Sequence, residues 1–181
     1  GAIGMSDALG RLSPDIVVIL GDRYEMLAAA SAALLLGLPI AHLHGGEITE
    51  GAFDDAIRHA ITKMAHLHFV AAEPYRRRVI QLGEQPDRVH HVGAPGLDNI
   101  DNLDLLDPGA LEGVLGFGLG AGYFLVTYHP VTLQSGDPAA PTREMLTALD
   151  AFAERKILFT GVNADPGHDA IARAITDYAQ A

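Results

Sequence analysis

Ionisable side chains gather in one stretch of the sequence, "AHLHGGEITEGAFDDAIRHA", which covers residues 41–60. His44 and Glu47 flank two glycines, and residues without a Cβ let the backbone approach a ligand closely. Asp54 and Arg58 follow, four positions apart, so on a helix their side chains share one face. Carboxylates and an imidazole can exchange protons with a substrate, and a guanidinium can bind phosphate. The stretch is therefore a candidate for acid–base chemistry.

The charged pairs in this stretch also have a purely structural interpretation. Asp54 with Arg58, and Asp55 with His59, can form salt bridges within one helix on a solvated surface. That interpretation would be preferred for a helix that stood alone. It is weakened here because the helix directly follows the glycine-rich turn.

A metal site is another interpretation, because His42, His44 and Glu47 could converge on one ion. His42 and His44 are two positions apart, so we expect them on the same face of a strand. No other spacing of histidines and carboxylates supports a metal site. We therefore predict none. A histidine beside glycines is also often a simple turn residue.

Further polar residues stand at the ends of apolar runs. Asp22 and Arg23, in "GDR", come directly after "DIVVIL", and His129 stands near the end of "YFLVTYHP". In parallel α/β sheets, ligands bind beyond the carboxyl ends of the strands. We therefore expect these residues at a binding site, with His129 facing a cleft between two lobes. The structural alternative for Asp22 is an N-cap of the following helix.

Alternating strand-like and helix-like segments indicate how these residues are positioned. Short apolar runs predict strands at 15–20, 39–43, 67–72, 89–92, from 123 onward and at 156–159. Segments with helical spacing or composition predict helices at 25–36, 52–65, 73–82, 142–154 and 169–179. The alternation predicts a doubly wound α/β fold. A connection rich in Gly, Pro, Asn and Asp, at 93–109, divides a first lobe at 1–105 from a second at 106–181.

Composition excludes several classes of protein. Of the 181 residues, 49% are hydrophobic, which is enough to build a core. The formal net charge of −11 disfavours a nonspecific nucleic-acid binder. The basic run Arg76–Arg78 is too short to argue for nucleic acid, and we interpret it as a solvated helix face. Because the sequence has no cysteine, disulfides and thiolate metal sites are impossible.

The sequence shows neither a secretory signal nor a membrane span. The most apolar stretch, residues 27–43, contains Gly37, Pro39 and His42, so it favours a helix, a turn and a strand. We therefore expect a cytoplasmic protein with no nucleic-acid partner and no membrane partner.

The ordered set of these motifs resembles the hydrolysing UDP-N-acetylglucosamine 2-epimerases, the sialic-acid and capsule-sugar branch of the nucleotide-sugar 2-epimerases. The similar stretches are residues 14–73, "HVGAPGLDNI", "VTYHPVT" and "NADPG", which together cover nearly the whole chain. The resemblance implies two Rossmann-like lobes of the glycosyltransferase-B type with the active site in the cleft. It also implies a fold truncated at both ends, without the family's opening strands and its later diphosphate-binding loop.

The resemblance implies a reaction and a set of residues. UDP is eliminated from UDP-N-acetylglucosamine to give a glycal, and water then adds to release N-acetylmannosamine, with no metal or cofactor. The implied acid–base residues are Asp22, Glu47, Asp54, Arg58 and His129. The implied substrate-binding residues are Arg23, His44, Asp55 and Asn163. The implied partners are a UDP-sugar and further copies of the same chain.

Three alternatives stay open at this point. One is a non-hydrolysing epimerase, which returns UDP-N-acetylmannosamine, or an enzyme for a modified sugar such as a di-N-acetylated or GDP-linked hexosamine. Another is an inactive lobe that keeps the fold and binds a nucleotide sugar. The last is a generic flavodoxin-like binding domain, in which Glu47 and Arg58 have no function.

Overall fold

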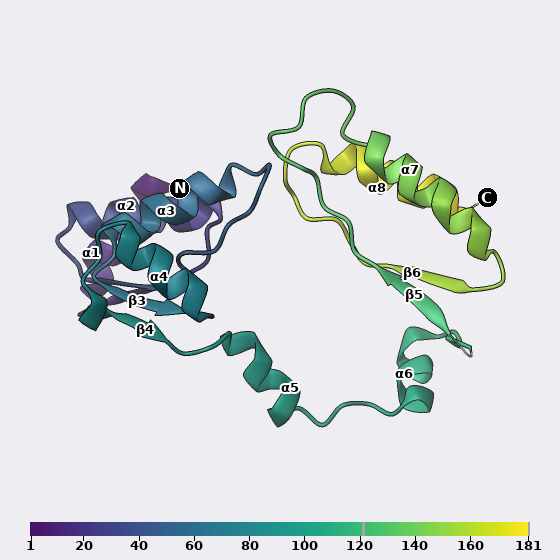
Figure 1. Ribbon diagram of the computed structural model, residues 1–181, viewed down its shortest axis with the longest axis horizontal. Coiled ribbons are helices and arrows are strands. Elements are labelled where there is room, and N and C mark those ends of the chain that lie inside the picture. The colour runs from purple at the N-terminus through teal and green to yellow at the C-terminus, as the bar shows by residue number, and fades with distance from the viewer. Residues whose placement is uncertain (121, 181) are drawn as a thin grey trace. The chain divides into compact units, whose positions relative to one another are not determined.

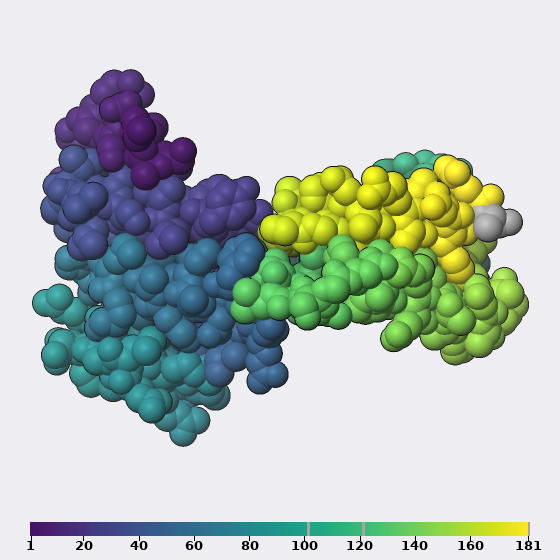
Figure 2. Space-filling view, turned by 90° about the horizontal axis from the view of Figure 1, so that it is seen from above, coloured from purple at the N-terminus to yellow at the C-terminus, as the bar shows by residue number. Residues whose placement is uncertain are grey.

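The computed structural model describes residues 1–120 and 122–180 of the chain. The chain divides into two compact units, Gly1–Leu103 and a second that begins at Asp104. Each unit packs its own strands and helices together, as the ribbon and space-filling views show (Figures 1 and 2).

The first unit is a parallel four-stranded sheet in the order β1-β2-β3-β4. Its strands are β1 (Val17–Leu20), β2 (Ile40–Leu43), β3 (Leu67–Val70) and β4 (Val89–His91). Its main helices are α1 (Ala2–Leu12), α2 (Tyr24–Leu35), α3 (Asp54–Met64) and α4 (Glu73–Gln81). Right-handed crossovers between consecutive strands place the connecting helices on one face, where Figure 1 shows α2, α3 and α4. The predicted α/β class is confirmed.

The core of the first unit lies between this sheet and the helices. Small side chains on α2, at Ala30 and Ala33, let the helix pack closely on Ile19 and Ile40. One row of paired positions crosses the sheet under the helices and is at most 2% exposed; it consists of Ile19, His42, His68 and Val89. Two histidines in a buried row need polar partners, because a buried imidazole without hydrogen bonds is costly.

The predicted and observed elements of this unit differ mainly at their ends. The predicted strand at 67–72 ends at Val70, because Ala72 is already the N-cap of α4. The predicted connection at 93–109 is partly helical, and contains η2 (Pro95–Leu97) and α5 (Asp98–Asn102). A short 3₁₀ turn, η1 (Pro86–Arg88), leads into β4.

The second unit contains two parallel strands, β5 (Tyr123–Val126) and β6 (Lys156–Phe159). The helix α6 (Pro108–Leu115) precedes them and is capped by the Asp107 carboxylate, which accepts from the Ala110 N–H at 2.9 Å. The helices α7 (Ala140–Leu149) and α8 (His168–Gln180) lie side by side (Figures 1 and 2). The predicted helix at 142–154 is too long, since η3 (Asp150–Phe152) replaces its end. In the part of the chain that the structure describes, no helix has the length and apolarity to cross a bilayer.

Candidate active site

The candidate site of the first unit lies at the carboxyl ends of β1 and β2. Gly21 and His44 follow these strands, and their N–H groups donate to the carbonyls of Leu43 and Phe69, each at 3.0 Å. Both residues then adopt a positive φ, +80° at Gly21 and +64° at His44. The polar residues that come next therefore leave the sheet at the edge where parallel α/β proteins bind ligands.

Arg58 is the buried cation of this edge. Its side chain is 7% exposed, and its Nη2 donates to the Asp22 carboxylate and to the Thr49 hydroxyl at 2.8 Å. Its Nη1 lies 3.7 Å from Asp55 Oδ1. A guanidinium with so little water around it needs counter-charges, and the two carboxylates supply them. Sequence-distant residues of the turn after β1, the glycine-rich loop and α3 thus meet at one cation.

One donor group of Arg58 is left over. Its Nη1 is buried and makes no hydrogen bond to any described residue, although Asp55 is close by. A buried N–H without an acceptor costs about 1–3 kcal/mol, and the charge of the nearby Asp55 carboxylate offsets part of this cost.

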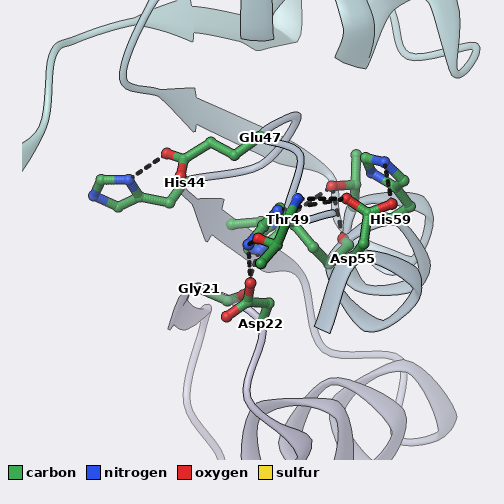
Figure 3. Close-up of polar contacts among 10 residues, drawn as sticks. Gly21, Asp22, His44, Glu47, Thr49, Asp55 and His59 are labelled. Atoms are coloured by element: carbon green, nitrogen blue, oxygen red, sulfur yellow. Dashed lines mark hydrogen bonds and ion pairs between the residues drawn. The ribbon is translucent and has the colours of Figure 1, made fainter. Parts of the chain in front are cut away.

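The loop before α3 is fastened to the first turn of that helix. The Thr49 N–H donates to Asp55 Oδ1 at 3.0 Å, and Asp55 Oδ2 lies 3.6 Å from His59 Nε2. Figure 3 shows these three side chains grouped on one side of the site. The Asp55–His59 pair expected from the spacing is confirmed. Asp54 is the first residue of α3 and so lies at the same helix terminus.

His44 and Glu47 form a separate pair on the turn that follows β2. His44 Nδ1 lies 2.7 Å from Glu47 Oε1, and the two side chains are 25% and 29% exposed. Figure 3 shows the two side chains directed toward each other. Their partial exposure leaves them accessible to a ligand, whereas the Arg58 side chain is buried and held by its contacts.

The turn between His44 and Glu47 packs against α4. Gly46 has a φ of +81°, and a Cβ there would lie 2.5 Å from the Tyr75 carbonyl oxygen and 2.8 Å from Val79 Cγ2. The Arg78 guanidinium donates to the Gly46 carbonyl. The prediction that Arg76–Arg78 is a solvated face was therefore wrong for two of the three residues, since Arg76 also donates to the Val89 carbonyl at 3.0 Å.

The buried His42 side chain connects the loop after β1 with helix α3. Its Nε2 lies 2.8 Å from the Gly21 carbonyl and its Nδ1 3.2 Å from the Thr62 hydroxyl. A carbonyl only accepts, so Nε2 carries the proton when the ring is neutral. The one proton of the Thr62 hydroxyl then lies between two acceptors, His42 Nδ1 and the Arg58 carbonyl oxygen at 3.0 Å. Burial lowers the pKa of the His42 imidazole from 6.5 to about 4, so the ring is neutral near pH 7.

The structure argues against convergence of His42, His44 and Glu47 on a metal ion. Within residues 1–120 and 122–180, no three His, Asp or Glu side chains are placed to hold one. The expectation that His42 and His44 share a strand face was wrong, because β2 ends at Leu43 and His44 turns away with a positive φ.

Asp22 and Arg23 lie between β1 and α2. The structural alternative, in which Asp22 caps α2, is wrong. Arg23 occupies the N-cap position, and no side chain caps the helix there. The reason is that the Asp22 carboxylate is taken by Arg58. Arg23 lies 3.4 Å from the Glu25 carboxylate and stacks over the Tyr24 ring.

In the second unit, two of the predicted site residues meet at the ends of β5 and β6. The Asn163 backbone N–H donates to His129 Nδ1 at 3.2 Å, and the Asn163 amide donates to Asp165 at 2.6 Å. Because a backbone N–H can only donate, a neutral His129 carries its proton on Nε2. The Nε2–H of this neutral ring can donate to a phosphate oxygen, but it cannot accept a proton from a substrate.

Sequence reasoning missed the contributions of Thr49 and Arg78. Thr49 gives its hydroxyl to Arg58 and its N–H to Asp55. A threonine in a polar loop carries no distinctive signal, and its contacts exist only once α3 has packed on the sheet. The polar His42 within the apolar run of β2 was the one visible sign of a buried network.

The whole sequence, residues 1–181, matches the family described as UDP-N-acetylglucosamine 2-epimerase. A curated relative from Campylobacter jejuni, named GDP/UDP-N,N'-diacetylbacillosamine 2-epimerase (hydrolyzing), is 45% identical over 97% of this chain and 46% of its own length. The polysialic acid biosynthesis protein P7 of Escherichia coli is 42% identical over 89% of this chain and 41% of its own. The chain thus spans less than half the length of these relatives.

Solved structures agree at the level of the fold. The UDP-GlcNAc 2-epimerase of Methanocaldococcus jannaschii, in complex with UDP-GlcNAc and UDP, superposes with a TM-score of 0.78. The match covers 99% of this chain and 50% of that one at 18% identity. The predicted fold class and the resemblance to the hydrolysing branch are confirmed. The chain belongs to the UDP-N-acetylglucosamine 2-epimerase family.

Proposed function

We propose that the protein carrying this chain is a hydrolysing UDP-N-acetylglucosamine 2-epimerase, which converts UDP-GlcNAc and water into N-acetylmannosamine and UDP. The observation that carries the proposal is the buried Arg58, held by Asp22 and Asp55 at the sheet edge that also bears the His44–Glu47 pair. Family membership over the full sequence supports it.

The reaction places three demands on the site. In the first step the C2–H and C1–O bonds break, a C1=C2 double bond forms, and UDP leaves. Water then adds at C1, C2 is protonated on the opposite face, and N-acetylmannosamine is released. These steps need a base, an acid and cationic or N–H donors for the departing diphosphate.

The proposed residues meet these demands with ordinary side-chain chemistry. Carboxylates accept or return protons, while Arg58 and His129 donate hydrogen bonds to anionic oxygens. We assign acid–base and charge-stabilising roles to Asp22, Glu47, Asp54, Arg58 and His129. We assign substrate contacts to Arg23, His44, Asp55 and Asn163. The His129 Nε2–H, fixed by the Asn163 backbone, supports a nucleotide contact.

A second candidate substrate has a specific observation in its favour. The Campylobacter jejuni relative, 45% identical to this chain, is named for a di-N-acetylated bacillosamine carried on GDP or UDP. The same elimination chemistry applies to that sugar, because it also carries the reacting C1 and C2 centres. The two candidate sugars differ in the substituents that they carry at C4 and C6.

The test is a substrate panel with the protein that carries this chain. UDP-GlcNAc, UDP-N,N'-diacetylbacillosamine and its GDP analogue are supplied separately, and nucleotide and sugar products are followed by NMR. Free UDP together with N-acetylmannosamine supports the proposal. Turnover of the diacetylated sugars alone moves the assignment to the second candidate. UDP-N-acetylmannosamine without free UDP indicates the non-hydrolysing reaction, and binding without turnover indicates an inactive lobe.

The proposal also includes the setting of the reaction. We infer a cytoplasmic enzyme that associates with copies of itself and takes no nucleic-acid or membrane partner. The solved neighbour with UDP-GlcNAc and UDP bound supports a UDP-sugar as the small-molecule ligand. Light scattering coupled to size-exclusion chromatography tests the self-association, and a single monomer mass would contradict it.

A further inference from the structure

We infer that the base which removes the C2 proton is the His44 imidazole, and that Glu47 orients this imidazole instead of taking the proton itself. The inference rests on the proposed function. It refines two roles proposed above, because His44 changes from a substrate contact to the catalytic base and Glu47 changes from an acid–base residue to a positioning residue.

The hydrogen bond between the two side chains fixes which ring nitrogen is basic. An ionised carboxylate can only accept, so the 2.7 Å contact puts the proton of neutral His44 on Nδ1. Nε2 then carries the free lone pair, and it has no hydrogen-bond partner among the described residues. A base oriented by a third group in this way is the arrangement that enzymes use to activate proton transfer. Figure 3 shows the far edge of the His44 ring directed away from Glu47.

The backbone of His44 supplies an independent observation. Its φ of +64° lies in the left-handed region, which is unfavourable for a residue with a Cβ. The surroundings hold it there, because its N–H donates to the Phe69 carbonyl and Gly46 is packed against α4. Residues held in sparsely populated conformations cluster at functional sites. Glycine would fit this position with less strain. The chain has a histidine there despite the strain, which supports a role for the imidazole.

Two nearby carboxylates are less available than His44. Asp22 accepts from Arg58, and Asp55 lies beside Arg58 and accepts from the Thr49 N–H. Asp22 Oδ2 and Asp55 Oδ1 are therefore engaged by donors and would have to break these contacts to take a proton. The His44 Nε2 is free of such contacts and its side chain is 25% exposed.

The step balances with the groups named. The C2 proton passes to His44 Nε2, the C2–H electron pair becomes the second bond between C1 and C2, and the C1–O pair leaves with UDP. The product is an imidazolium whose Nδ1–H is paired with the Glu47 carboxylate, which stabilises the new charge. The imidazolium then releases its proton to solvent, while a different group protonates C2 on the opposite face.

The first experiment is chemical rescue of His44→Gly in the protein that carries this chain. Glycine accepts the positive φ, so this variant is expected to fold. We expect kcat for UDP release from UDP-GlcNAc to fall by about 10²–10⁴-fold, the usual contribution of a general base. Added imidazole should restore the rate at least tenfold, in proportion to the neutral imidazole present. The matched control is His91→Ala, an exposed histidine on β4, which should keep the wild-type rate and gain nothing from imidazole.

The second variant, Glu47→Gln, tests the positioning role. It should lower kcat at least tenfold while KM stays within twofold, whereas a loss of general structure would change both. His44→Gly with a rate within threefold of wild type, or without any gain from imidazole, would overturn the inference. Failure of the proposed function is a different outcome, in which the wild-type protein itself releases no UDP from any nucleotide sugar in the panel.

Discussion

The packing of Gly46 against α4 gives the most quantitative prediction. In Gly46→Ala the new Cβ would lie 2.5 Å from the Tyr75 carbonyl oxygen and 2.8 Å from Val79 Cγ2, at a φ of +81°. The left-handed backbone costs alanine about 1–2 kcal/mol. The contact with backbone atoms adds about 1–3 kcal/mol, the usual penalty of overpacking. We therefore expect the free energy of unfolding to fall by roughly 2–5 kcal/mol.

Gly37→Ala is the matched control for this change. Gly37 has a φ of +70°, and a Cβ there would meet no atom within 4 Å, so it reports the backbone cost alone. Urea unfolding of both variants, with the slope against urea unchanged, gives the two free energies. Gly46→Ala should be the more destabilised by about 1–3 kcal/mol. Equal losses in the two variants would refute the close packing of α4 on the turn.

Three further predictions concern the network around the site. The free energy of unfolding should fall by about 3 kcal/mol between pH 6.5 and 4 on account of His42, because burial lowers its pKa to about 4 and only the unfolded chain binds a proton in that window. Unfolding measured across this range should show a weaker pH dependence in His42→Asn, and an identical one would contradict the assignment. Arg58→Ala should lower the free energy of unfolding by about 2–4 kcal/mol, because it leaves the mostly buried Asp22 carboxylate unpaired. A double-mutant cycle with Asp22→Asn should show a coupling energy of at least about 0.5 kcal/mol, and additive losses would argue against the pair. Arg78→Ala should lower the free energy of unfolding by about 1–3 kcal/mol, because the hydrogen bond to the Gly46 carbonyl is lost. Arg77 is exposed, so Arg77→Ala should stay within about 0.5 kcal/mol of wild type. Similar losses in the two variants, measured by urea unfolding, would contradict this prediction.

Periodicity located most of the elements of the first unit. Each predicted strand there overlaps an observed one, because buried parallel strands read as short apolar runs with few polar residues. The same rule placed "GDR" and "HLHGGE" at the carboxyl edge of the sheet, where the structure has them. Element ends were less well predicted, since caps and 3₁₀ turns such as η3 depend on contacts that periodicity does not contain.

The contacts that assemble the site could not be predicted from spacing. Arg58 reaches Asp22 across 36 positions, and Arg78 reaches Gly46 across 32. Both contacts require the helices to be packed on the sheet first. The positive φ of His44 is likewise supported by its surroundings, because residues other than glycine adopt this conformation only rarely. What spacing supplied was the set of chemical groups, and tertiary packing decided their partners.

The most direct test of the proposed chemistry follows hydrogen at C2. The protein that carries this chain is incubated with UDP-GlcNAc in deuterated water, and the released sugar is examined by NMR. The account predicts free UDP and N-acetylmannosamine with one deuterium at C2, because the C2–H bond is broken and remade from solvent. Release of UDP with the original hydrogen retained at C2 would contradict it, since that result means simple hydrolysis at C1 with no base acting at C2.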